Sequence, residues 1–145
     1  MQRTLGIDLG TTNSVMAHMT RGEPRIIRSS SAGEEITPSV VGISKSGSIA
    51  VGRTAKNRGS NSFSSIKRFM GRKYSDEIVQ RVKSMNLPYE VVEGTNGNAV
   101  VKLKDSDQTY TPVDISAMIL RQLRLDAEAS VDNGSFRRAV ISVPA

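Results

Sequence analysis

The stretch from Gly6 to Ser14 combines the residue types that bind a magnesium-bound phosphate. It reads Gly-Ile-Asp-Leu-Gly-Thr-Thr-Asn-Ser, so an apolar run carries one acid, Asp8, and then breaks at Gly10 into hydroxyl and amide side chains. The backbone amides of such a turn can bind an anion together, and a glycine lets a phosphate approach the backbone closely. Because magnesium takes oxygen ligands and often keeps its waters, we expect Asp8 to act on the cation through water.

Two interpretations of this stretch compete. A short Asp-x-Gly-Thr pattern recurs by chance, and a tight turn capped locally by Asp8 would need no ligand. The longer string has predicted strands on both sides, which favours phosphate binding. The sequence contains no Gly-x-x-x-x-Gly-Lys-Ser/Thr pattern, so a P-loop is excluded.

The residues around this stretch are predicted to form short strands joined by tight turns. Apolar and β-branched runs bounded by glycine, proline and polar residues predict strands near 3–9, 13–19 and 24–28. Further extended runs are predicted at 40–43 and 49–51 and around Val91, Val100 and Tyr110. Asn96-Gly97 between two of these runs predicts a hairpin.

The strongest helix signal runs from Pro112 to about Val131. Thr111 suits the N-cap position, Pro112 the first helical position, and Asp114 the first turn, where a negative charge is favourable. A shorter helix is predicted over 76–85, with Ile78, Val79, Val82 and Met85 on one apolar face.

A last strand is predicted at 139–143. It should lie parallel to the first strand, with the long helix as the crossover between them. Strands followed by a mixed insert, a long helix and another strand predict an incomplete α/β layer structure.

Composition bounds what the chain can do. Its 145 residues, 37% hydrophobic and 23% charged, suit one soluble globular domain with a core. No apolar run is long enough to cross a bilayer, so no membrane role is expected. The absence of cysteine excludes disulfides and thiolate metal sites and indicates a reducing compartment, which we take to be the cytoplasm.

The formal net charge of +6 raises the question of a polyanionic partner. The basic residues are scattered, apart from short groups at 67–68, 72–73 and 137–138, and the chain has three Tyr, three Phe and no Trp for base stacking. We therefore favour a solvated basic surface, with no nucleic-acid partner.

The stretch 6–14 resembles the first phosphate loop of the actin-like ATPase superfamily, and more closely that of the seventy-kilodalton heat-shock chaperones (DnaK-type). Five later strings follow in that family's order, whereas sugar kinases share only the first loop. They lie at 37–41 (Thr-Pro-Ser-Val-Val), 51–56 (Val-Gly and Ala-Lys), 66–72 (Ile-Lys-Arg-Phe-Met-Gly-Arg), 115–120 (Ile-Ser-Ala-Met-Ile-Leu) and 139–145 (Ala-Val-Ile-Ser-Val-Pro-Ala). Two departures are a short stretch at 59–65, which lacks the proline expected before the Lys-Arg pair, and the basic charge balance.

The resemblance implies roles for the loop residues. Asp8 matches the acid near magnesium and is expected to assist catalysis from there. The residues expected around the β- and γ-phosphates are Gly10, Thr11, Thr12 and Asn13. The implied cofactors are ATP or ADP and Mg²⁺.

It also implies roles for two residues far from the loop. Lys67 matches a lysine near the γ-phosphate and the attacking water, where its charge stabilises the transferring phosphoryl group. Pro144 matches a proline that relays the nucleotide state as a switch. Without the resemblance, Lys67 is explained as a solvated cation and Pro144 as a strand terminator.

The implied fold is an incomplete actin-like, ribonuclease-H-like ATPase lobe, the N-terminal half of a nucleotide-binding domain over 1–145. A core lobe is expected at about 1–38 and 111–145, and a small α+β insert lobe at about 39–110. Since a full nucleotide site lies between two such halves, we expect weak or absent hydrolysis by this chain alone. An uncovered sheet edge would also favour self-association.

The function implied is therefore the N-terminal ATPase segment of an ATP-dependent molecular chaperone in protein folding and the stress response. Partners in that context are unfolded client peptides, a J-domain co-chaperone and a nucleotide exchange factor. Two alternatives remain open at this point: a non-catalytic truncated paralogue that acts as an interaction module through 39–110, and a basic nucleic-acid-binding domain. Whether the chain is itself an enzyme also stays open.

Overall fold

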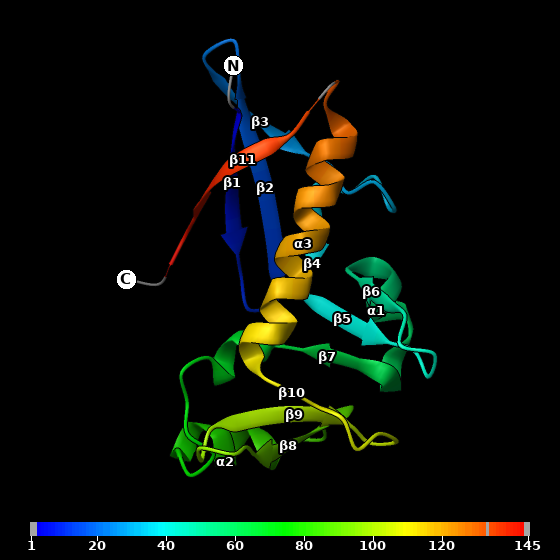
Figure 1. Ribbon diagram of the computed structural model, residues 1–145, viewed down its shortest axis with the longest axis vertical. Helices are drawn as coiled ribbons and strands as arrows, with labels where there is room; N and C mark the ends of the chain where they lie inside the picture. Colours follow the sequence, from blue (N-terminus) through cyan, green and yellow to red (C-terminus); the bar gives the residue numbers. More distant parts are fainter. Residues whose placement is uncertain (1–2, 133, 144–145) are drawn as a thin grey trace.

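The computed structural model describes residues 3–132 and 134–143, and its largest sheet has five strands (Figure 1). Four follow the order β11-β1-β2-β3, and β4 pairs with the start of β2 beside β3. The pair β1–β11 is parallel and the others are antiparallel, so the sheet is mixed. The strand bounds are β1 (Arg3–Leu9), β2 (Asn13–Thr20), β3 (Glu23–Ile27), β4 (Ile36–Pro38) and β11 (Phe136–Ile141).

One long helix, α3 (Pro112–Ser130), lies against this sheet (Figure 1). Its buried residues recur at helical spacing, and Ile115 and Leu123 are completely shielded from solvent. Leu5 and Ile7 of β1 are buried in the same core, two residues apart, because alternate side chains of a strand point to one face. This packing fixes β1, and therefore the turn that follows it.

Two three-stranded sheets, at the opposite end of α3 from β3 in Figure 1, complete the structure. The first has the order β6-β5-β7 and the second β10-β9-β8. Short helices and 3₁₀ turns connect them. The bounds are β5 (Val40–Ile43), β6 (Ile49–Val51), α1 (Arg53–Asn57), η1 (Gly59–Asn61), β7 (Ser62–Ser64), η2 (Ile66–Phe69), α2 (Glu77–Lys83), β8 (Tyr89–Glu93), β9 (Ala99–Leu103) and β10 (Thr109–Tyr110).

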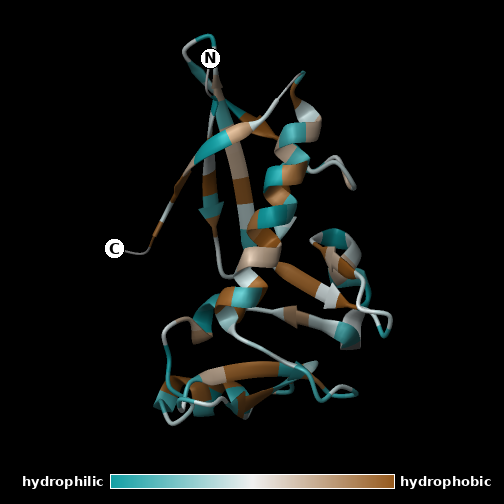
Figure 2. Cartoon of the chain, viewed as in Figure 1, coloured by the Kyte–Doolittle hydropathy of each residue, from teal (hydrophilic) through white to brown (hydrophobic). Residues whose placement is uncertain are grey.

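An aromatic cluster joins these two small sheets. Phe63 of β7 is fully buried, and its ring centroid lies 5.5 Å from that of Tyr89 and 5.7 Å from that of Tyr110. The Tyr89 hydroxyl donates to the Ser64 carbonyl oxygen at 2.6 Å, and burial raises the pKa of Tyr89 to about 12. The hydropathy colouring shows brown, apolar segments in β5 and β9, which face this part of the core (Figure 2).

The start of α3 is held by a reciprocal cap. The Asp114 amide donates to Thr111 Oγ1 at 3.0 Å, and the Thr111 amide donates to Asp114 Oδ2 at 2.9 Å. This capping box satisfies two amides that the first turn of a helix leaves without partners. The start predicted from Thr111-Pro112 is confirmed.

Replacement of Thr111 by alanine is expected to lower the free energy of unfolding by about 1 kcal/mol, because the Asp114 amide loses its acceptor. Urea unfolding followed by circular dichroism measures the change. Val113→Ala, in the same turn and 62% exposed, is the matched control and should shift the midpoint far less. Equal effects of the two substitutions would contradict a role for the cap.

Other predicted elements need correction. The shorter helix is confirmed as α2, but Ile78 and Met85 are 39% and 52% exposed, because only Val79 and Val82 of the predicted face reach the core. The last strand begins at Phe136 and ends at Ile141, earlier than predicted at both ends. Its parallel pairing with β1 sets those limits. No helix in the described part of the chain is both long and apolar enough to cross a membrane.

Candidate functional site

Three carbonyl groups at the turn between β1 and β2 accept hydrogen bonds from donors in other parts of the chain. The Leu9 carbonyl accepts from Lys67 Nζ at 2.6 Å, and the Gly10 carbonyl accepts from Ser39 Oγ at 2.8 Å. The Thr12 carbonyl accepts from the Ser39 amide at 2.9 Å. Among the described residues, none accepts a hydrogen bond from the amides of 10–12. A turn with several paired carbonyls and with free amides is suited to an anion.

Gly10 is required by the tightness of this turn. A Cβ atom built at this position would lie 2.1 Å from the Asn13 carbonyl oxygen, well inside van der Waals contact. Because the obstacle is backbone, a side chain at position 10 would have to open the turn itself.

Replacement of Gly10 by alanine is therefore expected to weaken inorganic pyrophosphate binding below detection and to destabilise the fold by about 1–3 kcal/mol through overpacking. Titration calorimetry and urea unfolding measure the two effects. Gly6→Ala is the matched control in the same hairpin, since its Cβ would meet only the Ala17 carbonyl oxygen, at 3.5 Å. Wild-type binding by Gly10→Ala would refute the need for glycine.

Lys67 reaches the turn from the 3₁₀ segment η2, far along the sequence. Ile66 and Phe69 are 3% and 1% exposed, so they fix η2 in the core while the half-buried Lys67 extends to the Leu9 carbonyl. Ser65, just before η2, has a φ of 56°, a left-handed conformation that is uncommon without glycine. The structure thus places a cation at a turn that the linear sequence separates from it by 58 positions.

Asp8 lies near the end of β1 with an exposed side chain. Its Oδ1 accepts from Ser142 Oγ at 2.8 Å, and the Ser142 amide donates to the Ile7 carbonyl at 3.0 Å. Since β1 and β11 run parallel, their carboxyl ends meet at one edge of the sheet, where ligands of α/β folds commonly bind. Pro144, the predicted switch, lies outside the described residues.

The remaining predicted residues sit on the turn itself. Thr11 is half-buried, whereas Thr12 and Asn13 are exposed and available to a ligand. The hairpin, Asp8 and Lys67 therefore form one continuous region. The described residues contain no group of three or more His, Cys, Asp or Glu side chains placed to hold a metal ion.

Sequence reasoning missed three serines at this region. The Ser39 hydroxyl contacts the Gly10 carbonyl, the Ser142 hydroxyl contacts Asp8, and the Ser14 hydroxyl contacts that of Ser39. The signal for Ser39 was present in Thr-Pro-Ser, but its function depends on the pairing of β4 with β2, which no local pattern encodes. Ser142 depends in the same way on the β1–β11 register.

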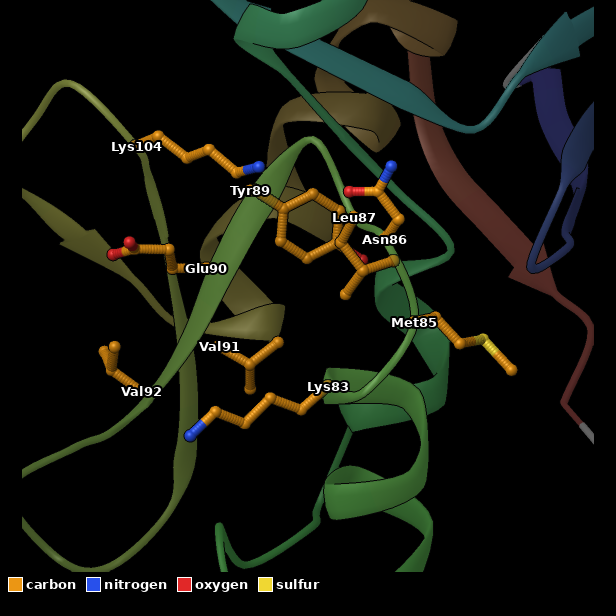
Figure 3. Close-up of a pocket in the computed structure, with 9 residues that line it drawn as sticks. All are labelled: Lys83, Met85, Asn86, Leu87, Tyr89, Glu90, Val91, Val92 and Lys104. Atoms are coloured by element: carbon orange, nitrogen blue, oxygen red, sulfur yellow. The ribbon is translucent and has the colours of Figure 1, made fainter.

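A cavity of about 430 Å³ lies elsewhere, between the end of α2 and β8 (Figure 3). Leu87 and Val91 line it with Lys83 and Lys104, and none of its lining residues is a predicted site residue. Lys83 already donates to the Tyr74 hydroxyl and lies over its ring. The cavity is thus separate from the turn at 10–12.

Comparison with known proteins finds one family across almost the entire chain. The family described as Hsp70 protein matches residues 4–145. The chaperone protein DnaK of Carsonella ruddii (strain PV) is 42% identical over 149 residues, which cover 100% of this chain and 24% of that protein. The corresponding protein of Akkermansia muciniphila is 41% identical over 151 residues (100% and 23%), and that of Thalassiosira pseudonana 40% over 149 residues (100% and 24%).

These similarities confirm the fold class. The mixed sheet with few helices is that of a partial actin-like ATPase lobe. The chain spans about a quarter of the length of the curated relatives it matches.

Proposed function

The chain belongs to the Hsp70 family, and on that premise we propose that it supplies the first phosphate loop and a catalytic lysine to the nucleotide site of an ATP-dependent chaperone. The observation that carries the proposal is the contact between Lys67 Nζ and the Leu9 carbonyl, 2.6 Å long, at a turn whose own amides have no described acceptor. A cation and a set of free amides at one point suit the phosphates of ATP or ADP.

Each residue then has a distinct task. The amides and hydroxyls of Thr11 and Thr12, with Asn13 beside them, hold the β- and γ-phosphates. Lys67 neutralises the negative charge that develops on the γ-phosphoryl group, and its bond to the Leu9 carbonyl is then broken or shared. Phosphoryl transfer depends mainly on such stabilisation of charge by the protein.

Asp8 would bind the magnesium ion of the site through water. Its Oδ1 is engaged by Ser142, and the carboxylate is exposed, so it can accept hydrogen bonds from metal-bound water. A bound Mg²⁺ would supply positive charge that offsets the negative charge of the nucleotide phosphates. A single nearby carboxylate suits an ion that keeps most of its waters.

We assign two lobes to the chain. Residues 1–38 and 111–145 would form a core lobe, which holds the five-stranded sheet and α3, and 39–110 an insert lobe, which holds the two small sheets. Pro144 keeps its proposed role as a switch in this scheme.

For the whole protein we propose a chaperone of the cytoplasm that binds unfolded client peptides. A J-domain co-chaperone and a nucleotide exchange factor would regulate its cycle. Support comes from the three DnaK relatives, each similar over the full length of this chain.

Amide-resolved NMR on the ¹⁵N-labelled chain tests the phosphate loop. Titration with Mg·ADP should shift the amides of Gly10, Thr11 and Thr12 more than those of the β2–β3 turn at Arg21-Gly22. The shifts should saturate, with weak affinity because one half of a site encloses little of the nucleotide. An unmoved loop at saturating nucleotide would contradict the proposal.

A further inference from the structure

Ser39 is the single residue between β4, which ends at Pro38, and β5, which begins at Val40. It therefore marks the point where the chain leaves the five-stranded sheet and enters the first small sheet. Ser39 is 5% exposed and Thr37, two residues earlier, is also 5% exposed, so the junction is packed against the rest of the protein.

Ser39 makes contacts with both ends of the phosphate turn. Its amide donates to the Thr12 carbonyl at 2.9 Å, and its hydroxyl donates to the Gly10 carbonyl at 2.8 Å. These two hydrogen bonds tie the Gly10 and Thr12 carbonyls to one residue and thus limit how far the turn between them can open.

A second buried hydroxyl orients the first. Ser14 Oγ lies 2.9 Å from Ser39 Oγ, and Ser14 is fully buried. A serine hydroxyl has one proton, and that of Ser39 goes to Gly10, so Ser14 must be the donor of this pair. The chain of hydrogen bonds runs from Ser14 to Ser39 to the Gly10 carbonyl.

We propose that Ser39 is a positioning residue, which holds the turn at 10–12 in the shape that presents its amides to phosphate. The proposal rests on the proposed function, because that shape matters for activity only if the turn binds phosphate. Without the Ser39 hydroxyl, the Gly10 carbonyl is unpaired and the peptide that follows it can rotate, which would redirect the Thr11 amide.

The two serines differ in what their loss would do. Removal of the Ser14 hydroxyl leaves only a lone pair of Ser39 unmet and keeps the bond to Gly10. Removal of the Ser39 hydroxyl frees the Gly10 carbonyl and also leaves the buried Ser14 donor without its acceptor. Ser14→Ala is therefore a matched control for Ser39→Ala.

The test measures ¹⁵N order parameters in the ligand-free, labelled chain. We expect the order parameters of the amides of 10–12 to be about 0.85 in the wild-type chain, which is typical of rigid backbone. In Ser39→Ala they should fall below about 0.6. Ser39→Cys, nearly isosteric but a weak donor, should be intermediate. Ser39→Thr keeps the hydroxyl beside a cavity of about 240 Å³ that can accept the methyl group, and it should restore rigidity.

Two references separate positioning from general destabilisation. The order parameter of Gly22, in the turn between β2 and β3, should stay unchanged in every variant, and Ser14→Ala should keep the turn at 10–12 rigid. Unchanged order parameters in both Ser39→Ala and Ser39→Cys would overturn the proposal. Equal loss of order in Ser14→Ala and Ser39→Ala would overturn it as well. If Ser39→Ala does not fold, the order parameters of 10–12 are compared between Ser39→Cys and Ser39→Thr. Lower values in Ser39→Cys than in Ser39→Thr support the proposal, and wild-type values in both overturn it.

Pyrophosphate binding links this result to the proposed function. Loss of one hydrogen bond to the loop should weaken binding about fivefold in Ser39→Ala. If pyrophosphate changes no amide chemical shift of the wild-type chain, the proposed phosphate binding is wrong. The order parameters then still decide whether Ser39 positions the turn.

Discussion

Replacement of Lys67 by alanine should lower the rate of ATP hydrolysis by about 100-fold, the scale at which a preorganised charge acts on a transition state. The chain alone is expected to turn over slowly, so the measurement uses a chimera in which residues 1–145 replace the matching 23% of the Akkermansia muciniphila relative. Lys67 Nζ lies 2.6 Å from the Leu9 carbonyl, at the start of the phosphate turn, so its replacement removes a cation that contacts this turn directly. Single-turnover kinetics would show the loss in the chemical step.

The control for this change is Lys45→Ala, which removes an exposed lysine at the β5–β6 turn and should leave the rate unchanged. Lys67→Arg should restore little activity, because a planar guanidinium does not replace a compact ammonium. A chimera with Lys67→Ala that hydrolyses ATP within threefold of its parent would contradict a catalytic role for this lysine.

Replacement of Phe63 by alanine should lower the free energy of unfolding by about 3–5 kcal/mol, the usual cost of removing a buried aromatic side chain. Phe63 is 0% exposed and contacts both Tyr89 and Tyr110, so its loss would open a cavity where the two small sheets meet. A cost of this size is comparable to the whole stability of many small domains. Chemical unfolding followed by circular dichroism gives the change.

Ile49→Ala provides the comparison, because Ile49 lies on β6 and is 52% exposed. It should cost no more than about 0.5 kcal/mol, as surface substitutions usually do. Phe63→Leu, which keeps most of the apolar volume, should recover part of the loss. A similar loss of stability in Ile49→Ala and Phe63→Ala would show that the aromatic cluster does not hold the small sheets together.

Sequence reasoning succeeded where local signals were strong. The start of α3 is encoded by Thr111, Pro112 and Asp114, whose contacts are all within one turn of helix. The strands β1 and β2 and the hairpin at Asn96-Gly97 follow from alternation and turn residues in the same way.

Sequence reasoning failed for short elements and for residues whose burial depends on what packs against them. The segments α1, η2 and β7 have three to five residues, too few to show a period. Ile78 and Met85 fit the helical pattern of α2 but are exposed, since periodicity predicts a face and not what packs against it.

The sequence by itself determined the family, and it predicted which residues form the tight turn at 10–12, because a tight turn depends on neighbours along the chain. The Gly10 requirement is of this kind, since the obstacle to a side chain is Asn13, three residues away. Only the tertiary structure decided what surrounds that turn. Lys67, Ser39 and Ser142 come from three separate segments, and the strand pairings and the burial of η2 bring them there. Such contacts arise from packing across long sequence distances, which no local pattern records.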